Sequence, residues 1–106
     1  MILSTTNDVC GYKCTEHVGF VRGTSIRSSH LGRDLLASMR GLVGGEISEM
    51  TKVMAEAREQ ALDRMVSEAK RMGANGIIGI RVTSAEVMSG AAEILCYGTA
   101  VKLEAV

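Results

Sequence analysis

The chain of 106 residues contains no proline and no tryptophan, and it has only one phenylalanine and two tyrosines. Because proline is missing, one common breaker of helices and strands is absent, and the glycines mark the turns instead. Because aromatic side chains are so few, a stacking site for a planar cofactor such as a flavin is hard to assemble. The core must therefore be built from aliphatic side chains, alanine and methionine.

The chain also lacks an excess of either charge, since 12 basic and 12 acidic residues cancel. No broad positive surface is available for phosphate backbones or anionic lipids, so we expect neither nucleic acid nor a membrane as a partner. No stretch approaches the roughly 20 consecutive apolar residues that span a bilayer, and residues 1–6 lack the charged and apolar regions of a signal peptide. We therefore expect a cytoplasmic protein with one domain over residues 1–106.

Cysteine is present in an odd number, as Cys10, Cys14 and Cys96. Three cysteines cannot form a closed disulfide framework, and the sequence around them is typical of strands rather than of loops held by disulfides. We therefore expect free thiols.

A long amphipathic helix is the clearest element of the sequence. Residues 47–72 place apolar or small side chains three or four positions apart, on one face of a helix. These residues are Ile47, Met50, Met54, Ala57, Ala61, Met65, Ala69 and Met72. On the polar side Glu68 lies three residues before Arg71, and Gly73 can adopt the left-handed conformation that ends a helix. We expect the apolar stripe of this helix to lie on a sheet.

Four stretches of the sequence predict strands. Residues 2–5 form a short start at a sheet edge, and residues 12–26 form a long strand in which Gly19 and Gly23 indicate a bulge or a close approach of another backbone. Residues 77–87 and 92–103 are separated by Met88-Ser89-Gly90, which predicts a hairpin.

A second, shorter helix is predicted between the long strand and the long helix. Ser28-Ser29 offers a hydroxyl cap, and Gly44-Gly45 ends the segment. Apolar residues recur at helical spacing between them, at Leu31, Leu35, Leu36, Met39, Leu42 and Val43. The sequence therefore predicts an α+β fold with a small antiparallel sheet, two helices on one face and the order β-β-α-α-β-β.

The strands carry apolar or small residues on both faces. In the last strand Leu95, Val101 and Leu103 share one face, while Ile94 and Cys96 share the other. One pair of helices can cover only one face of a small sheet, so the second face needs another cover. In so short a chain the available cover is a second copy, which favours a closed homo-oligomer over a monomer.

Six short motifs are spread over almost the whole chain. They are Gly19-Phe20-Val21-Arg22-Gly23, Gly32-Arg33-Asp34-Leu35-Leu36, Val43-Gly44-Gly45, Ala57-Arg58, Gly73-Ala74-Asn75-Gly76-Ile77-Ile78-Gly79-Ile80 and Gly98-Thr99-Ala100-Val101. In this order and spacing they resemble the YbjQ family, whose members carry a heavy-metal-binding description. The resemblance implies a small α+β subunit, similar to dodecin-like folds, that assembles as a ring of five copies. It implies no reaction.

The sequence departs from that family in two places. Glu46 and Met50 stand where the family tends to carry an arginine and a tyrosine, and Cys10 and Cys14 are not part of the shared pattern. A metal site built on these cysteines would therefore be particular to this protein.

The sequence feature most typical of a metal site is Cys10, Cys14 and His17, which offer two soft sulfur ligands and an imidazole within eight residues. In a regular strand, Cys10 and Cys14 would stand roughly 13 Å apart, and His17 would face away from Cys14. The three residues can therefore share a soft or heavy metal ion only if a turn at Gly11 folds the segment, or if symmetry brings several copies together. Buried or idle thiols are the alternative.

Other patterns favour structural roles. The methionines of the long helix are typical of core packing rather than of a copper-binding track. Gly41-Leu42-Val43-Gly44-Gly45 lacks the lysine and hydroxyl of a phosphate loop, and no nucleophile–base pair stands out, so we do not expect an enzyme. The sequence thus favours a non-enzymatic, ring-forming protein, for which the family resemblance implies heavy-metal binding, with an oligomeric carrier of a small molecule, of dodecin type, as the alternative.

Overall fold

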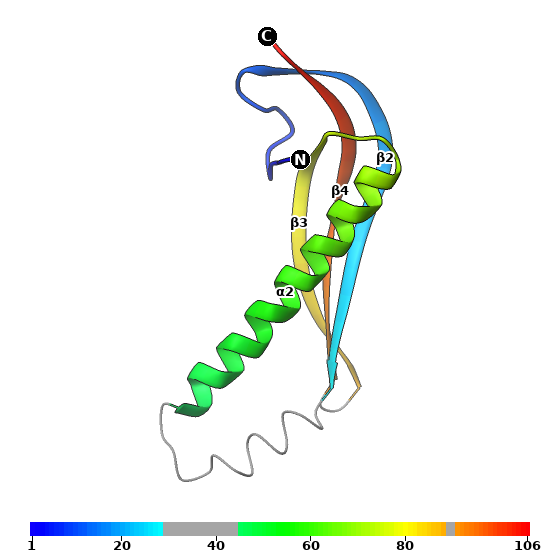
Figure 1. The fold of residues 1–106 in the computed structure, drawn as a ribbon. Helices are drawn as coiled ribbons and strands as arrows, with labels where there is room; N and C mark the ends of the chain where they lie inside the picture. The colour runs from blue at the N-terminus through cyan, green and yellow to red at the C-terminus, as the bar shows by residue number, and fades with distance from the viewer. Residues whose placement is uncertain (29–44, 89–90) are drawn as a thin grey trace.

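The fold is one long helix lying across a four-stranded sheet (Figure 1). A computed structural model describes residues 1–28, 45–88 and 91–106 of the chain. Its elements, in chain order, are β1 (Ile2–Leu3), β2 (Tyr12–Ser28), α2 (Gly45–Arg71), β3 (Gly76–Met88) and β4 (Ala91–Ala105). The long helix, the long strand and the two later strands thus lie close to their predicted positions.

The strands follow the order β1-β3-β4-β2 across the sheet. β4 runs antiparallel to both β3 and β2, and its register with β2 extends from Tyr12 opposite Ala105 to Ser28 opposite Ala91. β1 runs parallel to β3, with Ile2 opposite Gly76 and Leu3 opposite Ile77. The predicted pairing of the last two strands is confirmed, while residues 89–90 of the expected turn lie outside the described part.

The predicted antiparallel sheet with two helices on one face, in the order β-β-α-α-β-β, is wrong. The sheet is mixed, and the described residues contain one helix, α2, in the order β-β-α-β-β. The sheet is mixed because the chain crosses the end of the sheet between Leu3 and Tyr12, so β1 and β2 stand at opposite edges instead of forming a hairpin (Figure 1). The other expected helix falls on residues 29–44, outside the described residues.

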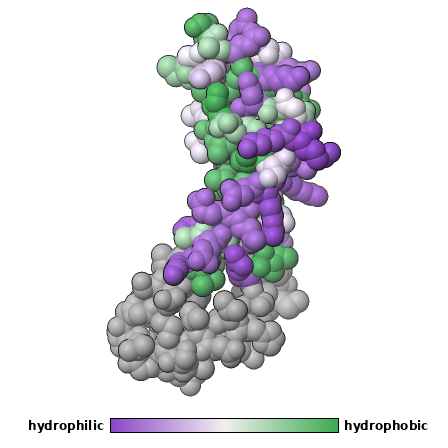
Figure 2. Space-filling view, in the orientation of Figure 1, coloured by the Kyte–Doolittle hydropathy of each residue, from purple (hydrophilic) through white to green (hydrophobic). Residues whose placement is uncertain are grey.

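α2 packs on the sheet through the predicted stripe of small and apolar residues. Ala57, Ala61, Met65 and Ala69 are all 0% exposed. They form one core with residues from three strands, which include Val21, Ile77, Ile80, Ile94, Cys96 and Ala100. On the opposite side of the helix, Arg71 Nε donates a hydrogen bond of 3.1 Å to Glu68 Oε2. Hydrophilic residues predominate along the middle of the molecule in Figure 2, which agrees with a polar outer face.

Glycines set the distance between α2 and the sheet. A Cβ built on Gly23 would collide with the backbone oxygen of Ala61 and lie 2.5 Å from the backbone nitrogen of Met65. The position therefore accepts only a residue without a side chain, which confirms the predicted close approach. Gly19 follows a register shift in the pairing of β2 with β4, as expected for a bulge.

The sheet face away from α2 is covered over one half only. There Ile78, Val101 and Leu103 are buried against Ile2 and Val9 of the N-terminal segment. Arg81 Nη1 helps to hold this segment, because it donates a 2.8 Å hydrogen bond to the carbonyl oxygen of Thr5. The N-terminus thus supplies part of the cover that we expected from a second copy.

The other half of this face stays open. Phe20 and Ile26 of β2 are 63% and 61% exposed. The neighbouring strand β4 contributes Leu95 and Tyr97. The ring centroid of Tyr97 lies 6.4 Å from that of Phe20. We call this surface the open half-face and define it as Phe20, Arg22, Thr24, Ile26, Leu95 and Tyr97.

Gly23→Ala should destabilise the protein by more than about 2 kcal/mol, because α2 must move away from β2 to admit the methyl group. Urea unfolding followed by circular dichroism measures the loss.

Gly73→Ala is the matched control. Gly73 has a φ of +84°, and a Cβ there meets nothing within 4 Å, so the substitution should cost only about 1 kcal/mol of backbone strain. Equal losses for the two variants would contradict the tight contact at Gly23.

Candidate functional site

The three predicted metal ligands lie at the end of the sheet where β2 begins. Cys10 occupies a turn in which the backbone nitrogen of Tyr12 donates a 3.1 Å hydrogen bond to the carbonyl oxygen of Val9. Gly11 adopts a φ of +84° there, the positive value that the third residue of a type II turn requires. Cys10, Cys14 and His17 are all exposed, and both thiols are free.

A bulge in β2 brings Cys14 and His17 together. Cys14 stands opposite Leu103 and His17 opposite Val101, with a register shift between Cys14 and Glu16. Leu103 and Val101 alternate along β4 and share the face away from α2, so their partners share it too. Cys14 Sγ lies 3.8 Å from His17 Nε2 and 4.0 Å from His17 Nδ1. The expectation that His17 faces away from Cys14 is wrong, because the extra residue in the strand reverses the alternation.

The bulge is tied to the neighbouring strand by polar contacts. Thr15 Oγ1 donates a 3.3 Å hydrogen bond to the carbonyl oxygen of Lys102, and Lys102 Nζ lies 3.3 Å from Glu16 Oε2. The thiol of Cys14 donates to the carbonyl oxygen of Glu16 at 3.6 Å. These contacts hold the strand around the pair in one geometry.

Cys10 is not part of this cluster. Within residues 1–28, 45–88 and 91–106, no three histidine, cysteine, aspartate or glutamate side chains gather closely enough to hold a metal ion. The turn at Gly11 therefore forms as anticipated, but it does not bring Cys10 to the other two ligands. One chain supplies a two-ligand cluster, Cys14 and His17.

Two kinds of chemistry use a thiol beside an imidazole. The pair can bind a soft metal ion, since thiolate and imidazole are both ligands for such ions. It also has the composition of a nucleophile and its base, which the sequence spacing alone did not reveal.

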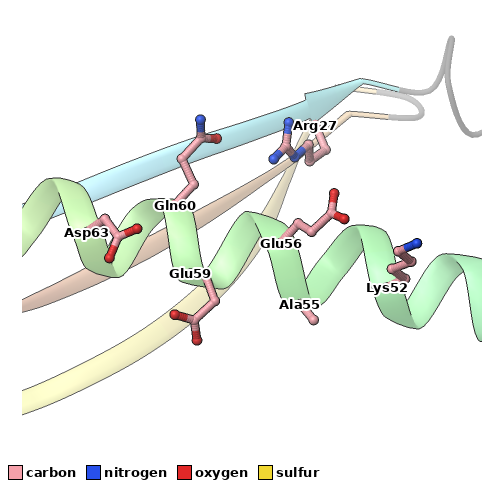
Figure 3. A pocket seen from close by; sticks show the side chains of 7 residues that line it. All are labelled: Arg27, Lys52, Ala55, Glu56, Glu59, Gln60 and Asp63. Carbon is pink, nitrogen blue, oxygen red and sulfur yellow. The ribbon is translucent and has the colours of Figure 1, made fainter.

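A shallow groove lies at the opposite end of the sheet, between α2 and the end of β2 (Figure 3). It has a volume of 530 Å³ and is lined by Arg27, Lys52, Ala55, Glu56, Glu59, Gln60 and Asp63. In Figure 3, Arg27 and Gln60 point into the space between strand and helix, whereas Glu59 points to the other side of the helix. The carboxylates are exposed and do not converge on one point.

The polar groups near this groove stabilise the contact of α2 with β2. Ser25, which is buried, donates a 2.8 Å hydrogen bond to Gln60 Oε1. Sequence patterns did not indicate the groove, because its charged residues come from a strand and a helix more than 20 positions apart. The groove is best explained as the end of the helix–sheet contact.

Cys96 has a different environment from the other cysteines. Its side chain is 1% exposed, in the core beneath α2. Burial raises the pKa of the Cys96 thiol, and the negative charge of Glu59 raises it further. Cys96 is therefore a structural residue and an unreactive thiol.

Within the described residues, a long helix lies on one face of a four-stranded mixed sheet and an exposed thiol–imidazole pair stands on the other face, which defines a small α+β protein. The chain belongs to the YbjQ family, whose model carries the description "putative heavy-metal-binding" and matches residues 1–104. This confirms the resemblance drawn from the six sequence motifs. Among the described residues, no helix is both long and apolar enough to cross a membrane.

Several relatives match the chain over nearly its full length. A UPF0145 protein of Thermus thermophilus is 53% identical over 98% of this chain and 91% of its own. A UPF0145 protein of Thermotoga maritima is 53% identical over 98% of both chains. A solved structure from Pediococcus pentosaceus, a DUF74 family protein of unknown function, has a TM-score of 0.64 over 98% of both chains at 18% identity. This last likeness shows the fold alone.

Thiol titration of the native protein should detect Cys10 and Cys14 at once and Cys96 only as the protein unfolds. A colorimetric thiol reagent, added with and without denaturant, measures both rates. Rapid reaction of all three thiols in the native state would contradict the burial of Cys96.

The pH dependence of stability gives a second readout. The folded state raises the pKa of Cys96, so at neutral pH the thiol is protonated in both the folded and the unfolded protein. As the pH rises above about 9, the thiol ionises first in the unfolded protein, and the folded state loses stability. Cys96→Ala should therefore lose less stability than the wild-type protein between neutral and strongly alkaline pH, as measured by urea unfolding.

Proposed function

We propose that this protein is a closed homo-oligomer that binds soft metal ions through exposed thiols and imidazoles on the helix-free side of its sheet. The observation that carries the metal proposal is the distance of 3.8 Å between Cys14 Sγ and His17 Nε2. The description of the YbjQ family supports the same class of ligand. The function is binding rather than catalysis.

The exposure of Cys14 and His17 favours binding over nucleophilic catalysis. A nucleophile needs a substrate pocket beside it, with donors placed to stabilise charge in the transition state. The 530 Å³ groove lies near Arg27, at the opposite end of β2 from Cys14. The thiol–imidazole pair instead stands on an open surface, which suits the capture of an ion.

The case for an oligomer starts from the open half-face. Soluble monomers rarely expose contiguous apolar surface without a partner, and Phe20 and Ile26 are each more than half exposed. The radius of gyration is 17.3 Å, compared with roughly 13 Å for a compact domain of this length. The chain is therefore more extended than a compact monomer of its length.

The sheet edges favour a ring. β2 is an edge strand over all its 17 residues, and within the described residues no strand pairs with β3 beyond Ile80 on its β1 side. Arg64 occupies one acceptor on β2, because its Nη1 donates a 2.6 Å hydrogen bond to the carbonyl oxygen of Thr24. The remaining backbone groups can pair with a neighbouring copy. Two different edges meeting head to tail generate a ring when the rotation closes.

In such a ring the helix-free faces of all copies lie on the same side of a continuous sheet. If the sheet closes with this side inward, the open half-faces of the copies face one another across the interior of the ring and cover one another. Five copies is the number that the family resemblance implies.

At micromolar concentration, light scattering should give a particle of about five times the 11.3 kDa of one chain. The double variant Phe20→Lys/Ile26→Lys should dissociate it, because the new charges would be buried without partners in the contact between copies.

Val106→Lys is the control for added charge, since Val106 is 92% exposed at the end of the chain. This variant should keep the wild-type mass. A wild-type protein of monomer mass would refute the oligomer.

Protein loaded with silver(I) and then desalted should retain about one ion per chain, because soft ions prefer thiolate ligands. The double variant Cys10→Ser/Cys14→Ser should retain almost none, and elemental analysis measures both. The double variant still contains the buried thiol of Cys96, so loss of silver(I) from it would show that this thiol alone does not retain the ion. Retention by neither protein would refute metal binding.

A further inference from the structure

We propose that Cys14 and His17 form a complete two-ligand site within one chain, selective for ions that accept two ligands, silver(I) and copper(I), over zinc. This inference rests on the proposed metal binding and adds to it the ligands, their number and the class of ion. It also assigns no role to Cys10.

The distances fit one ion between the two side chains. With the metal–sulfur and metal–nitrogen distances of zinc sites, about 2.3 and 2.0 Å, sulfur and nitrogen stand roughly 3.5 Å apart at a tetrahedral angle and about 4.3 Å apart in a straight line. Cys14 Sγ lies 3.8 Å from His17 Nε2 and 4.0 Å from Nδ1. Both values fall between those limits. Because the sulfur lies almost equally far from both ring nitrogens, the imidazole must turn to aim one nitrogen lone pair at an ion between the two side chains.

The backbone holds the two ligands at this spacing. The residues opposite Cys14 and His17 on β4 are Leu103 and Val101, which are buried against the N-terminal segment. The residues of the bulge between the ligands are tied to Lys102 through Thr15 Oγ1 and the Glu16 carboxylate. A site on paired strands loses less conformational entropy on binding than a site on a free loop.

The number of ligands decides which ion is preferred. Structural zinc sites use four protein ligands, and soft thiolate sites suit copper(I). In the part of the chain that the structure describes, no third histidine, cysteine or carboxylate completes the pair. An ion whose coordination is complete with one sulfur and one nitrogen should therefore bind to this pair more tightly than zinc does.

Binding has a simple proton balance. The thiol of Cys14 loses its proton to the buffer as the sulfur–metal bond forms, and the neutral imidazole of His17 donates a nitrogen lone pair. No electron is transferred, so no oxidant or reductant is needed.

The test compares four proteins by calorimetric titration with silver(I) in the presence of a competing thiol. Wild-type protein and Cys10→Ser should bind one ion per chain with affinities within about twofold of each other. Cys14→Ser and His17→Gln should each lose about tenfold or more. Cys10→Ser is the matched control, because Cys10 is an exposed thiol four residues away that lies outside the cluster.

A second readout separates a ligand from a structural residue. The imidazole resonances of His17 should shift when silver(I) is added to the wild-type protein, and they should not shift in Cys14→Ser. Circular dichroism and light scattering show whether each variant keeps its fold and its assembly.

Different failures contradict different proposals. Equal losses for Cys10→Ser and Cys14→Ser, zinc binding as tight as silver binding, or half an ion per chain would overturn the two-ligand site while leaving soft-metal binding in place. Absence of silver binding by the wild-type protein would overturn both.

Discussion

The contact of α2 with β2 at Gly23 is the constraint on which the rest of the structure depends. The helix backbone lies so close to the strand that no side chain fits at Gly23, and Ala61, which lies opposite it, is fully buried. This contact places α2 flat against one face of the sheet. The other face therefore needs a different cover, since α2 cannot protect both faces.

That other cover comes from two sources. Ile2 and Val9 bury Ile78, Val101 and Leu103 at one end of the sheet. Phe20 and Ile26 remain exposed beyond the reach of these contacts. Within the described residues, the unprotected part of this face thus lies on β2, at the edge of the sheet.

The sequence predicted regular elements well and irregular ones poorly. The stripe of Ala57, Ala61, Met65 and Ala69 identifies α2 because a helical period repeats over many residues. The parallel pairing of β1 depends instead on where residues 4–11 cross the sheet, and no local pattern records that path. The pairing of Cys14 with His17 was missed because the bulge after Cys14 reverses the alternation, and nothing at Thr15 marks it as a bulge residue.

The same irregularity explains why ligands can appear on a strand that is otherwise built for packing. In a regular strand, side chains three positions apart face opposite sides, so Cys14 and His17 could not share an ion. One extra residue places them side by side while their neighbours on β4, Leu103 and Val101, remain buried. A change confined to an edge strand alters which groups meet at the surface without disturbing the core beneath α2. Cys14 can therefore lie beside His17 on this fold without loss of its packing.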